Sequence, residues 1–194
     1  MLLAHPDSTV ALPIIQKIFD DIARRVEGVR AQAEIMRMQL LTTGKINVVS
    51  ADGRTNYVYD YGQQNKYNAS VAFGAANAEA DPIRDLIAAC DDMELKCGVR
   101  PRRMVMNRKT FLDMIQCPKL HKMQYPDDSA NNKFISEQEV QRFIEACTGL
   151  SIYVYSKKFA VLDHSTGLAH ATQEVNVVSD GVICLLPEGS LGKT

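Results

Sequence analysis

The chain has 194 residues, and 46% of them are hydrophobic, enough for the core of one large domain or two small ones, which excludes a disordered protein. The 22 basic and 23 acidic residues leave a net charge of −1, which argues against broad, charge-driven binding of nucleic acid. No apolar run approaches the roughly 20 residues of a membrane span and the N-terminus does not resemble a secretory signal, so we expect a soluble protein that is not secreted.

A long helix is the first predicted element, over residues 13–41. Pro13 suits a first helical turn, where its missing N–H costs nothing, and Gly44 suits a left-handed C-terminal cap. An apolar stripe with heptad spacing consists of Ile15, Phe19, Ile22, Val26, Val29, Ala33, Met36 and Leu40. Further apolar residues flank it, at Ile14, Ile18, Ile35, Met38 and Leu41. This wide face favours packing along a sheet or another subunit over a free coiled coil, and a helix about 40 Å long indicates an assembling protein before an enzyme.

A hairpin is predicted next, with strands over residues 45–49 and 55–61 and a turn that contains Asp52-Gly53. Tyr57, Tyr59 and Tyr61 share one face of the second strand. Two interpretations stay open for them: a contact with another subunit, where tyrosine is enriched, or a cover over the long helix. The small and polar residues that follow predict a connector, and therefore a domain boundary, before residue 81.

The rest of the chain predicts a mixed α/β unit that starts with clear helix signals. Asp81 caps a helix that ends at Gly98, a strand follows over 103–106, and Asn107 caps a helix over 108–116. Pro118 is expected to stop that helix and to lead into a polar loop over 119–134.

A capping box of Ser136 and Glu139 predicts a further helix, which ends at Gly149. Strands are predicted over 151–155, 158–162 and 168–178, with a turn at 163–167. The final apolar strand, over 182–186, is expected at the centre of the sheet. The predicted class is therefore α+β.

The C-terminal Gly192-Lys193-Thr194 suggests a phosphate-binding loop, but Pro187 stands where that motif needs its first glycine, and Pro has no N–H to donate. Asp163 and His164 are neighbours that would point to opposite sides of a strand, and His170 lies further along, so no metal site is predicted there. We therefore predict no enzyme activity, catalytic residues, cofactor or metal. Two alternatives stay open: a fragment of a nucleotide-binding enzyme that uses this terminus, and a helix-mediated interaction module.

The cysteines are odd in number and widely spaced, at Cys90, Cys97, Cys117, Cys147 and Cys184. Without a Cys-x-x-Cys pair, neither a disulfide framework nor a zinc site is favoured. Buried, reduced thiols are the simplest interpretation, and they suit a reducing compartment such as cytoplasm.

In order and spacing, several stretches resemble the major capsid protein family of tailed phages typified by phage lambda protein E. The stretches are Leu41 to Ile46 and Val58 to Gly62 around the hairpin, Asp81-Pro82 with Gly98 to Pro101, Arg103 to Met106, Asn107 to Phe111, and Leu185 to Thr194. The resemblance covers nearly the whole chain.

The resemblance implies a phage capsid fold of the Hong Kong-97 type, in which residues 1–64 form a peripheral domain with spine helix and hairpin. Residues 65–80 would be a connector, 81–187 an axial domain, and 188–194 the start of a return segment. It also implies self-association into pentamers and hexamers of a shell that encloses DNA, with scaffold or decoration proteins as candidate partners. No sequence-specific nucleic acid and no membrane would be bound. The location would be the virion and, during assembly, the host bacterial cytoplasm. Compared with that family, we expect the N-terminal arm, the extended loop and the return segment to be missing.

Overall fold

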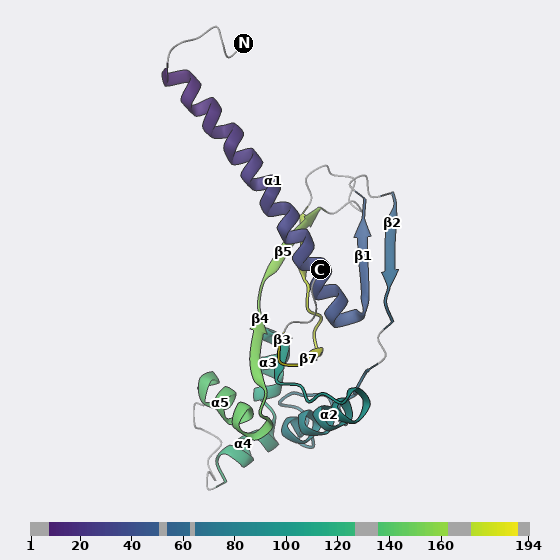
Figure 1. Cartoon of the computed structure of the whole chain (residues 1–194). Helices are drawn as coiled ribbons and strands as arrows, with labels where there is room; N and C mark the ends of the chain where they lie inside the picture. The colour runs from purple at the N-terminus through teal and green to yellow at the C-terminus, as the bar shows by residue number, and fades with distance from the viewer. Residues whose placement is uncertain (1–7, 51–53, 63–64, 127–135, 163–171, 190–194) are drawn as a thin grey trace.

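A computed structural model describes residues 8–50, 54–62, 65–126, 136–162 and 172–189 (Figure 1). One long helix, α1 (Ser8–Thr43), runs out from a body of short helices and strands and carries the N-terminal end away from it (Figure 1). Helices and strands are mixed along the chain, so the α+β class predicted from the sequence is confirmed.

Helix α1 begins five residues earlier than predicted, so Pro13 is its sixth residue and does not lie in the first turn. A proline there removes the hydrogen bond to the carbonyl of Thr9, but Ala11 and Leu12 are strong helix formers and the helix continues through it. The other end agrees with the prediction. Gly44 adopts a φ of 71°, and its N–H donates to the Leu40 carbonyl at 2.9 Å.

The central sheet has the strand order β4 (Ser151–Tyr155), β3 (Arg103–Asn107), β7 (Ile183–Leu186). Strand β3 pairs with β4 in parallel and with β7 antiparallel. The prediction that the last strand is central is therefore wrong, because β7 lies at the edge of this sheet. Its residues are all half-buried, whereas Met104 and Met106 of the middle strand are fully buried. Apolar composition alone did not distinguish the two positions.

Four helices cover one face of the sheet: α2 (Pro82–Cys97), α3 (Arg108–Ile115), α4 (Pro118–Gln124) and α5 (Glu137–Thr148). The main core lies between them and the sheet, around Met104, Phe111, Met114, Ile144 and Leu150. Helix α4 occupies residues 119–124 of the predicted loop over 119–134, so that prediction is wrong there, and residues 127–134 lie outside the described residues. Pro118 ends α3 as predicted but also starts a new helix, because proline is accepted in the first turn and Leu120 is then buried in the core.

The helix caps follow local hydrogen-bond chemistry in two of three cases. The side chains of Asp81 and Asn107 accept backbone N–H groups of α2 and α3, as predicted. Helix α5 also ends at Gly149 as predicted, but its capping box does not form. The Ser136 side chain makes no cap bond, and its carbonyl accepts the N–H of Glu139 at 3.0 Å.

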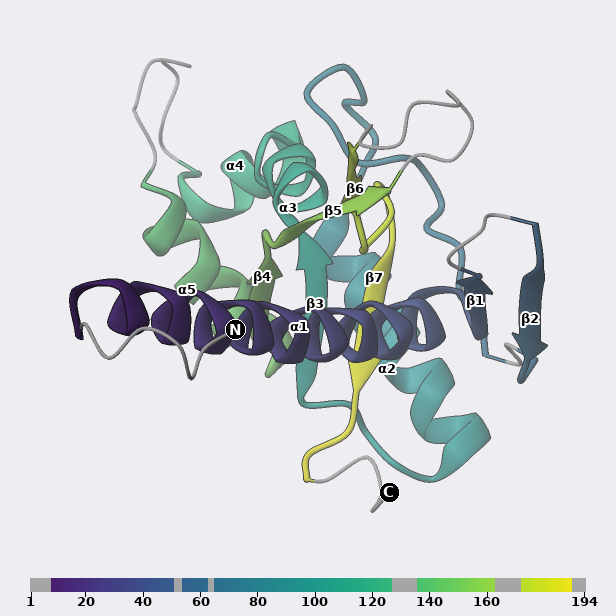
Figure 2. The same ribbon diagram turned by 90° about the horizontal axis from the view of Figure 1, so that it is seen from above.

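The C-terminal third of α1 lies across the other face of the sheet (Figure 2). A second apolar cluster forms there from Met38, Val177 and Val178, with Ile35, Leu41, Val105, Tyr155 and Phe159 packed against it. Strands β5 (Lys158–Leu162) and β6 (Thr172–Asn176) pair antiparallel as a separate ribbon beside α1. The predicted turn at 163–167 lies outside the described residues.

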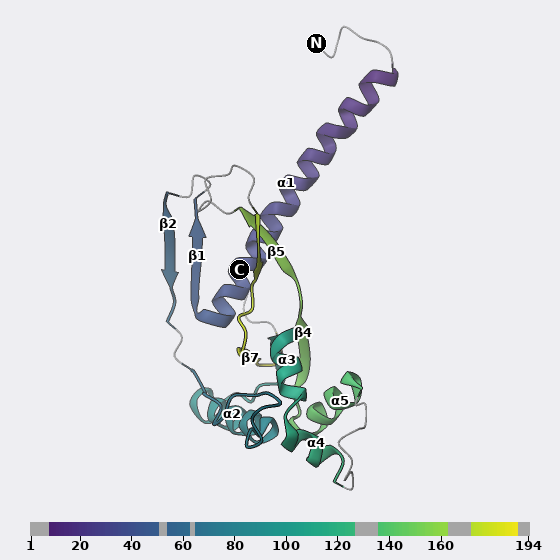
Figure 3. The same ribbon diagram turned by 180° about the vertical axis from the view of Figure 1, so that it is seen from behind.

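Strands β1 (Lys45–Val49) and β2 (Asn56–Asp60) form the predicted antiparallel hairpin, with Ile46 opposite Tyr59 and Val48 opposite Tyr57. The hairpin stands beside the C-terminal end of α1, away from the helices that cover the sheet (Figure 3). The described residues of the connector run from it down to α2 (Figure 1).

Candidate assembly surfaces

The heptad stripe of α1 is exposed where it was expected to be covered. Phe19, Ile22, Val26 and Val29 are 66%, 53%, 46% and 72% exposed, and we call these four residues the α1 stripe. Monomers leave single apolar side chains exposed, but a continuous row of this kind marks a contact surface.

The α1 stripe points away from the body of the protein. A helix turns by about 100° per residue, so Ile22 and Val29 lie roughly 160° and 180° around the axis from Met38. Met38 is buried against the sheet, and Ile35 and Leu41 pack beside it. The expected packing against a sheet is therefore made by residues that flank the heptad pattern in the C-terminal third of α1, where Ala33 and Met36 of the pattern are half-buried. Residues 16–30 project beyond the body (Figure 1), and all of their described side chains are exposed.

A polar contact fixes α1 on the sheet. The Glu34 carboxylate accepts a hydrogen bond from the Tyr155 hydroxyl at 2.9 Å and pairs with the Lys157 ammonium at 2.8 Å. The Lys157 and Tyr155 hydrogen bonds lower the pKa of Glu34. Burial and the neighbouring carboxylate raise the pKa of Tyr155 to about 12. The helix is thus held at one defined rotation, with the α1 stripe outward.

The tyrosines of the hairpin form a second exposed surface, the tyrosine surface, made by Tyr57, Tyr59 and Tyr61 at 53%, 56% and 65% exposure. They do not cover α1. The helix meets the outer edge of β1 instead, where the Gln39 side-chain oxygen accepts the N–H of Asn47 at 3.1 Å. The interpretation of the tyrosines as a cover over the long helix is therefore wrong, and the contact with another subunit stays a prediction.

An ion pair ties the two strands of the hairpin together. Lys45 and Asp60 face each other across the strands at 2.7 Å. The Lys45 hydrogen bond, followed by the N–H of Gly62, lowers the pKa of Asp60. This pair holds the end of the hairpin nearest α1, so the tyrosine surface has a defined position relative to the helix.

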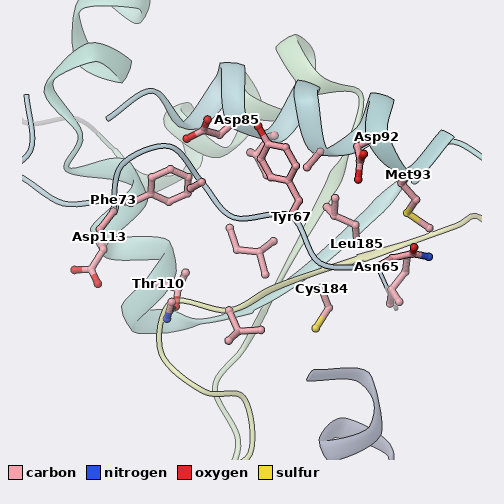
Figure 4. A pocket seen from close by; sticks show the side chains of 18 of the residues that line it. Asn65, Tyr67, Phe73, Asp85, Asp92, Met93, Thr110, Asp113, Cys184 and Leu185 are labelled. Carbon is pink, nitrogen blue, oxygen red and sulfur yellow. Dashed lines mark hydrogen bonds between the residues drawn. The ribbon is translucent and has the colours of Figure 1, made fainter. Parts of the chain in front are cut away.

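A groove of about 670 Å³ lies between α2, the connector and β7 (Figure 4). Tyr67 and Phe73 reach it from the connector, and Leu185 points into it from β7, on the side opposite to Cys184 (Figure 4). This groove was not predicted from the sequence, because the connector was interpreted only as a domain boundary. Tyr67 and Phe73, two aromatic residues in a polar stretch, were the signal that could have found it.

A network of hydrogen bonds holds the end of the groove where β7 begins. The Asn107 amide donates to the Val178 carbonyl at 3.1 Å and to the Asp180 carboxylate at 2.6 Å, while its oxygen accepts the N–H of Thr110 at 2.7 Å. Lys109 pairs with Asp180 at 2.7 Å. The hydrogen bonds from Lys109 and then Asn107 lower the pKa of Asp180.

The residues considered for catalysis or metal binding do not assemble in the described part of the chain. Asp163, His164, His170 and the Gly192-Lys193-Thr194 end lie outside the described residues. Across residues 8–189, apart from the ranges left undescribed, no three His, Cys, Asp or Glu side chains come together as a metal site could require. The carbonyl of Pro187 accepts hydrogen bonds from the Arg103 guanidinium, the nearer at 2.9 Å.

The five cysteines differ in burial, and Cys184 is half-buried. Cys90 and Cys117 are fully buried, and burial raises the pKa of both thiols. Cys97 and Cys147 are exposed, so the expectation of buried thiols is wrong for these two. All five thiols are free in the structure. Separately, none of the helices within the described residues is long and apolar enough to cross a membrane.

Comparison with known protein families matches residues 7–193 to the family described as phage major capsid protein E. Comparison with curated proteins gives no match. The family match spans nearly the whole chain, including the long helix with its exposed stripe, the hairpin and the sheet with its helices. The chain therefore belongs to the phage major capsid protein E family, and its role is that of a structural protein of the virion, whose copies assemble into the capsomers of a capsid.

Proposed function

We propose that copies of this chain close into pentamers and hexamers of an icosahedral shell by heterologous contacts, in which the α1 stripe of one copy meets a different surface of its neighbour. The observation that carries the proposal is the exposure of the stripe. Its four apolar residues lie on the part of α1 that projects beyond the protein's own core, and Glu34, Tyr155 and Lys157 hold the helix in place. Rotation between such contacts generates a ring.

A helix pair formed by two α1 stripes is the less favourable arrangement. Arg25 and Arg30 occupy positions that flank the stripe in its heptad register. In a parallel pair of α1 helices, Arg25 of each helix would approach Arg30 of the other. Two such contacts between arginines would repel. This supports a ring built from unlike surfaces over the dimeric, helix-mediated interaction module.

The proposal includes the finer features that the family resemblance implies. The fold is of the Hong Kong-97 type, with a peripheral domain over 1–64, a connector over 65–80, an axial domain over 81–187 and the start of a return segment over 188–194. The protein carries out no catalytic step and needs no cofactor or metal. It binds neither sequence-specific nucleic acid nor membrane, assembles in the host bacterial cytoplasm, and accepts scaffold or decoration proteins as partners.

The test compares two double variants with equal change in net charge. Ile22→Asp/Val29→Asp places two carboxylates on the α1 stripe, whereas Lys17→Asn/Arg24→Asn changes exposed residues on the other side of the same helix segment. Sedimentation velocity over a concentration series, with electron microscopy of the same samples, measures the assemblies. We expect rings or larger closed particles from wild type and the control, and monomers from the stripe variant. A stripe variant that assembles like wild type would refute the role of the α1 stripe.

A further inference from the structure

Strand β7 has an open backbone edge, and that edge forms one wall of the groove. Within the described residues β7 pairs with β3 alone, so its other edge has no strand beside it. Every residue from Asp180 to Leu186 lines the groove, including Leu185 on the α2 side and Cys184 on the α1 side (Figure 4). Successive side chains of a strand point to opposite faces of the sheet, so a wall that consecutive residues of β7 all line is the edge of the strand and not one of its faces. Such an edge presents N–H and C=O groups that an added strand can pair with.

The opposite wall is apolar and comes from α2 and the connector. Leu86, Ala89 and Met93 line it from α2, and Tyr67 and Phe73 from the connector. The four residues of β7 span about 13 Å at about 3.3 Å per residue. The groove therefore suits an extended segment of roughly four residues, one edge of which pairs with β7 while its side chains contact these apolar residues.

The charges around the groove select the occupant. Asp85, Asp92, Asp113 and Asp180 are among its lining residues, and none of the described lining residues is basic. Asp92 and Asp180 already pair with Lys96 and Lys109, so the preference for a basic occupant rests on Asp85 and Asp113. Asp85 is only 6% exposed, and the hydrogen bond to its carboxylate comes from a neutral group, the Ser70 hydroxyl. A buried carboxylate gains most from a basic partner, because a charge taken out of water needs an opposite charge.

We propose that the groove binds an extended segment of a second protein that carries Lys or Arg, which adds to β7 as an antiparallel or parallel fourth strand. A different protein fits better than the hairpin of another copy of this chain. The exposed strand of the hairpin, β2, carries Asp60 and no basic residue, and β1 is already held between β2 and Gln39. The inference is independent of the α1 stripe, so failure of one leaves the other standing.

The probe is a fluorescent heptapeptide, Ser-Val-Lys-Val-Lys-Val-Ser, with Ser-Val-Glu-Val-Glu-Val-Ser as its matched acidic control. Fluorescence anisotropy on the full chain measures affinity, and hydrogen exchange measured by mass spectrometry locates the bound peptide. We expect the basic peptide to bind at least about tenfold more tightly than the acidic one, and to slow exchange at residues 180–186. Equal binding of the two peptides, no binding of either, or protection confined to other residues would overturn the proposal.

Two tryptophan variants on neighbouring residues of α2 provide the structural control. Ala89→Trp fills the groove, whereas Ala88 faces a different surface beside Ile87, so Ala88→Trp leaves the groove open. We expect Ala89→Trp to lose binding and Ala88→Trp to keep it. Asp113→Asn is the third variant, because it removes a charge from the groove without adding bulk. It should weaken the binding of the basic peptide and leave that of the acidic peptide unchanged. Undiminished binding of the basic peptide to both Ala89→Trp and Asp113→Asn would contradict binding in this groove.

Discussion

Replacement of Asn107 by alanine tests the network that positions β7 beside the groove. The substitution removes the cap of α3, which is worth about 1 kcal/mol. It also leaves the carbonyl of Val178, a residue 1% exposed, without the hydrogen bond from the Asn107 amide, at a cost of about 1–3 kcal/mol. We expect the free energy of unfolding to fall by about 2–4 kcal/mol in urea denaturation followed by circular dichroism.

Asn107→Ser separates the two contributions, because a serine oxygen can cap α3 but cannot reach both acceptors. It should recover about 1 kcal/mol of the loss and no more. Two results would refute the reasoning: a loss below about 1 kcal/mol for Asn107→Ala, or equal stability of the Ala and Ser variants. The first would mean that the bonds to Val178 and Asp180 contribute nothing, and the second that the cap does not matter.

Three further changes probe α1. Met38→Ala should lower the free energy of unfolding by about 2 kcal/mol, because Met38 is buried against the sheet. Val29→Ala should change it by less than about 0.5 kcal/mol, because Val29 is exposed. Similar losses for the two variants in urea denaturation would contradict the placement of Met38 on the sheet and of Val29 in solvent. Gly28→Ala should raise thermal stability by about 0.5–1 kcal/mol, because a Cβ there meets nothing within 4 Å; a lower melting temperature would show a missed contact. The hydrogen bonds that lower the pKa of Glu34 stabilise the fold at pH values above 4.5, the usual pKa of a glutamate. This contribution is lost as the pH falls through the lower pKa of the folded state. The difference in free energy of unfolding between wild type and Glu34→Gln should therefore shrink below about pH 4.5.

Local hydrogen-bond chemistry explains which parts of the fold could be predicted from the sequence. Asp81, Asn107 and Gly44 act on backbone groups within a few residues of themselves, so the sequence around them contains all that decides the helix end. Pro118 shows the limit of this logic. The residue is compatible with the end of one helix and the start of another, and the burial of Leu120 in the core decided between them.

Tertiary contacts explain what could not be predicted. The position of β7 in the sheet depends on which strands pair, and four apolar residues fit an edge with a groove as well as a centre. The groove itself needed the connector to fold back beside α2, which no spacing in the sequence specifies. Periodicity likewise predicted an apolar stripe on α1, but a stripe does not say whether it packs on its own chain or on another.

The energy available from the α1 stripe indicates why a ring suits it better than an isolated pair. Full burial of a Val, Ile or Phe side chain is worth about 1.5–3 kcal/mol, so the exposed parts of these four residues could yield roughly 4–7 kcal/mol. Association costs about 4–15 kcal/mol in lost freedom of motion. One such contact therefore comes close to balance at best. In a closed ring every copy takes part in two contacts, one through its stripe and one through the surface that receives a stripe. The last copy to enter therefore gains the free energy of two contacts but loses its translational and rotational freedom only once. A weak contact that is repeated in this way gives stable capsomers and few free dimers.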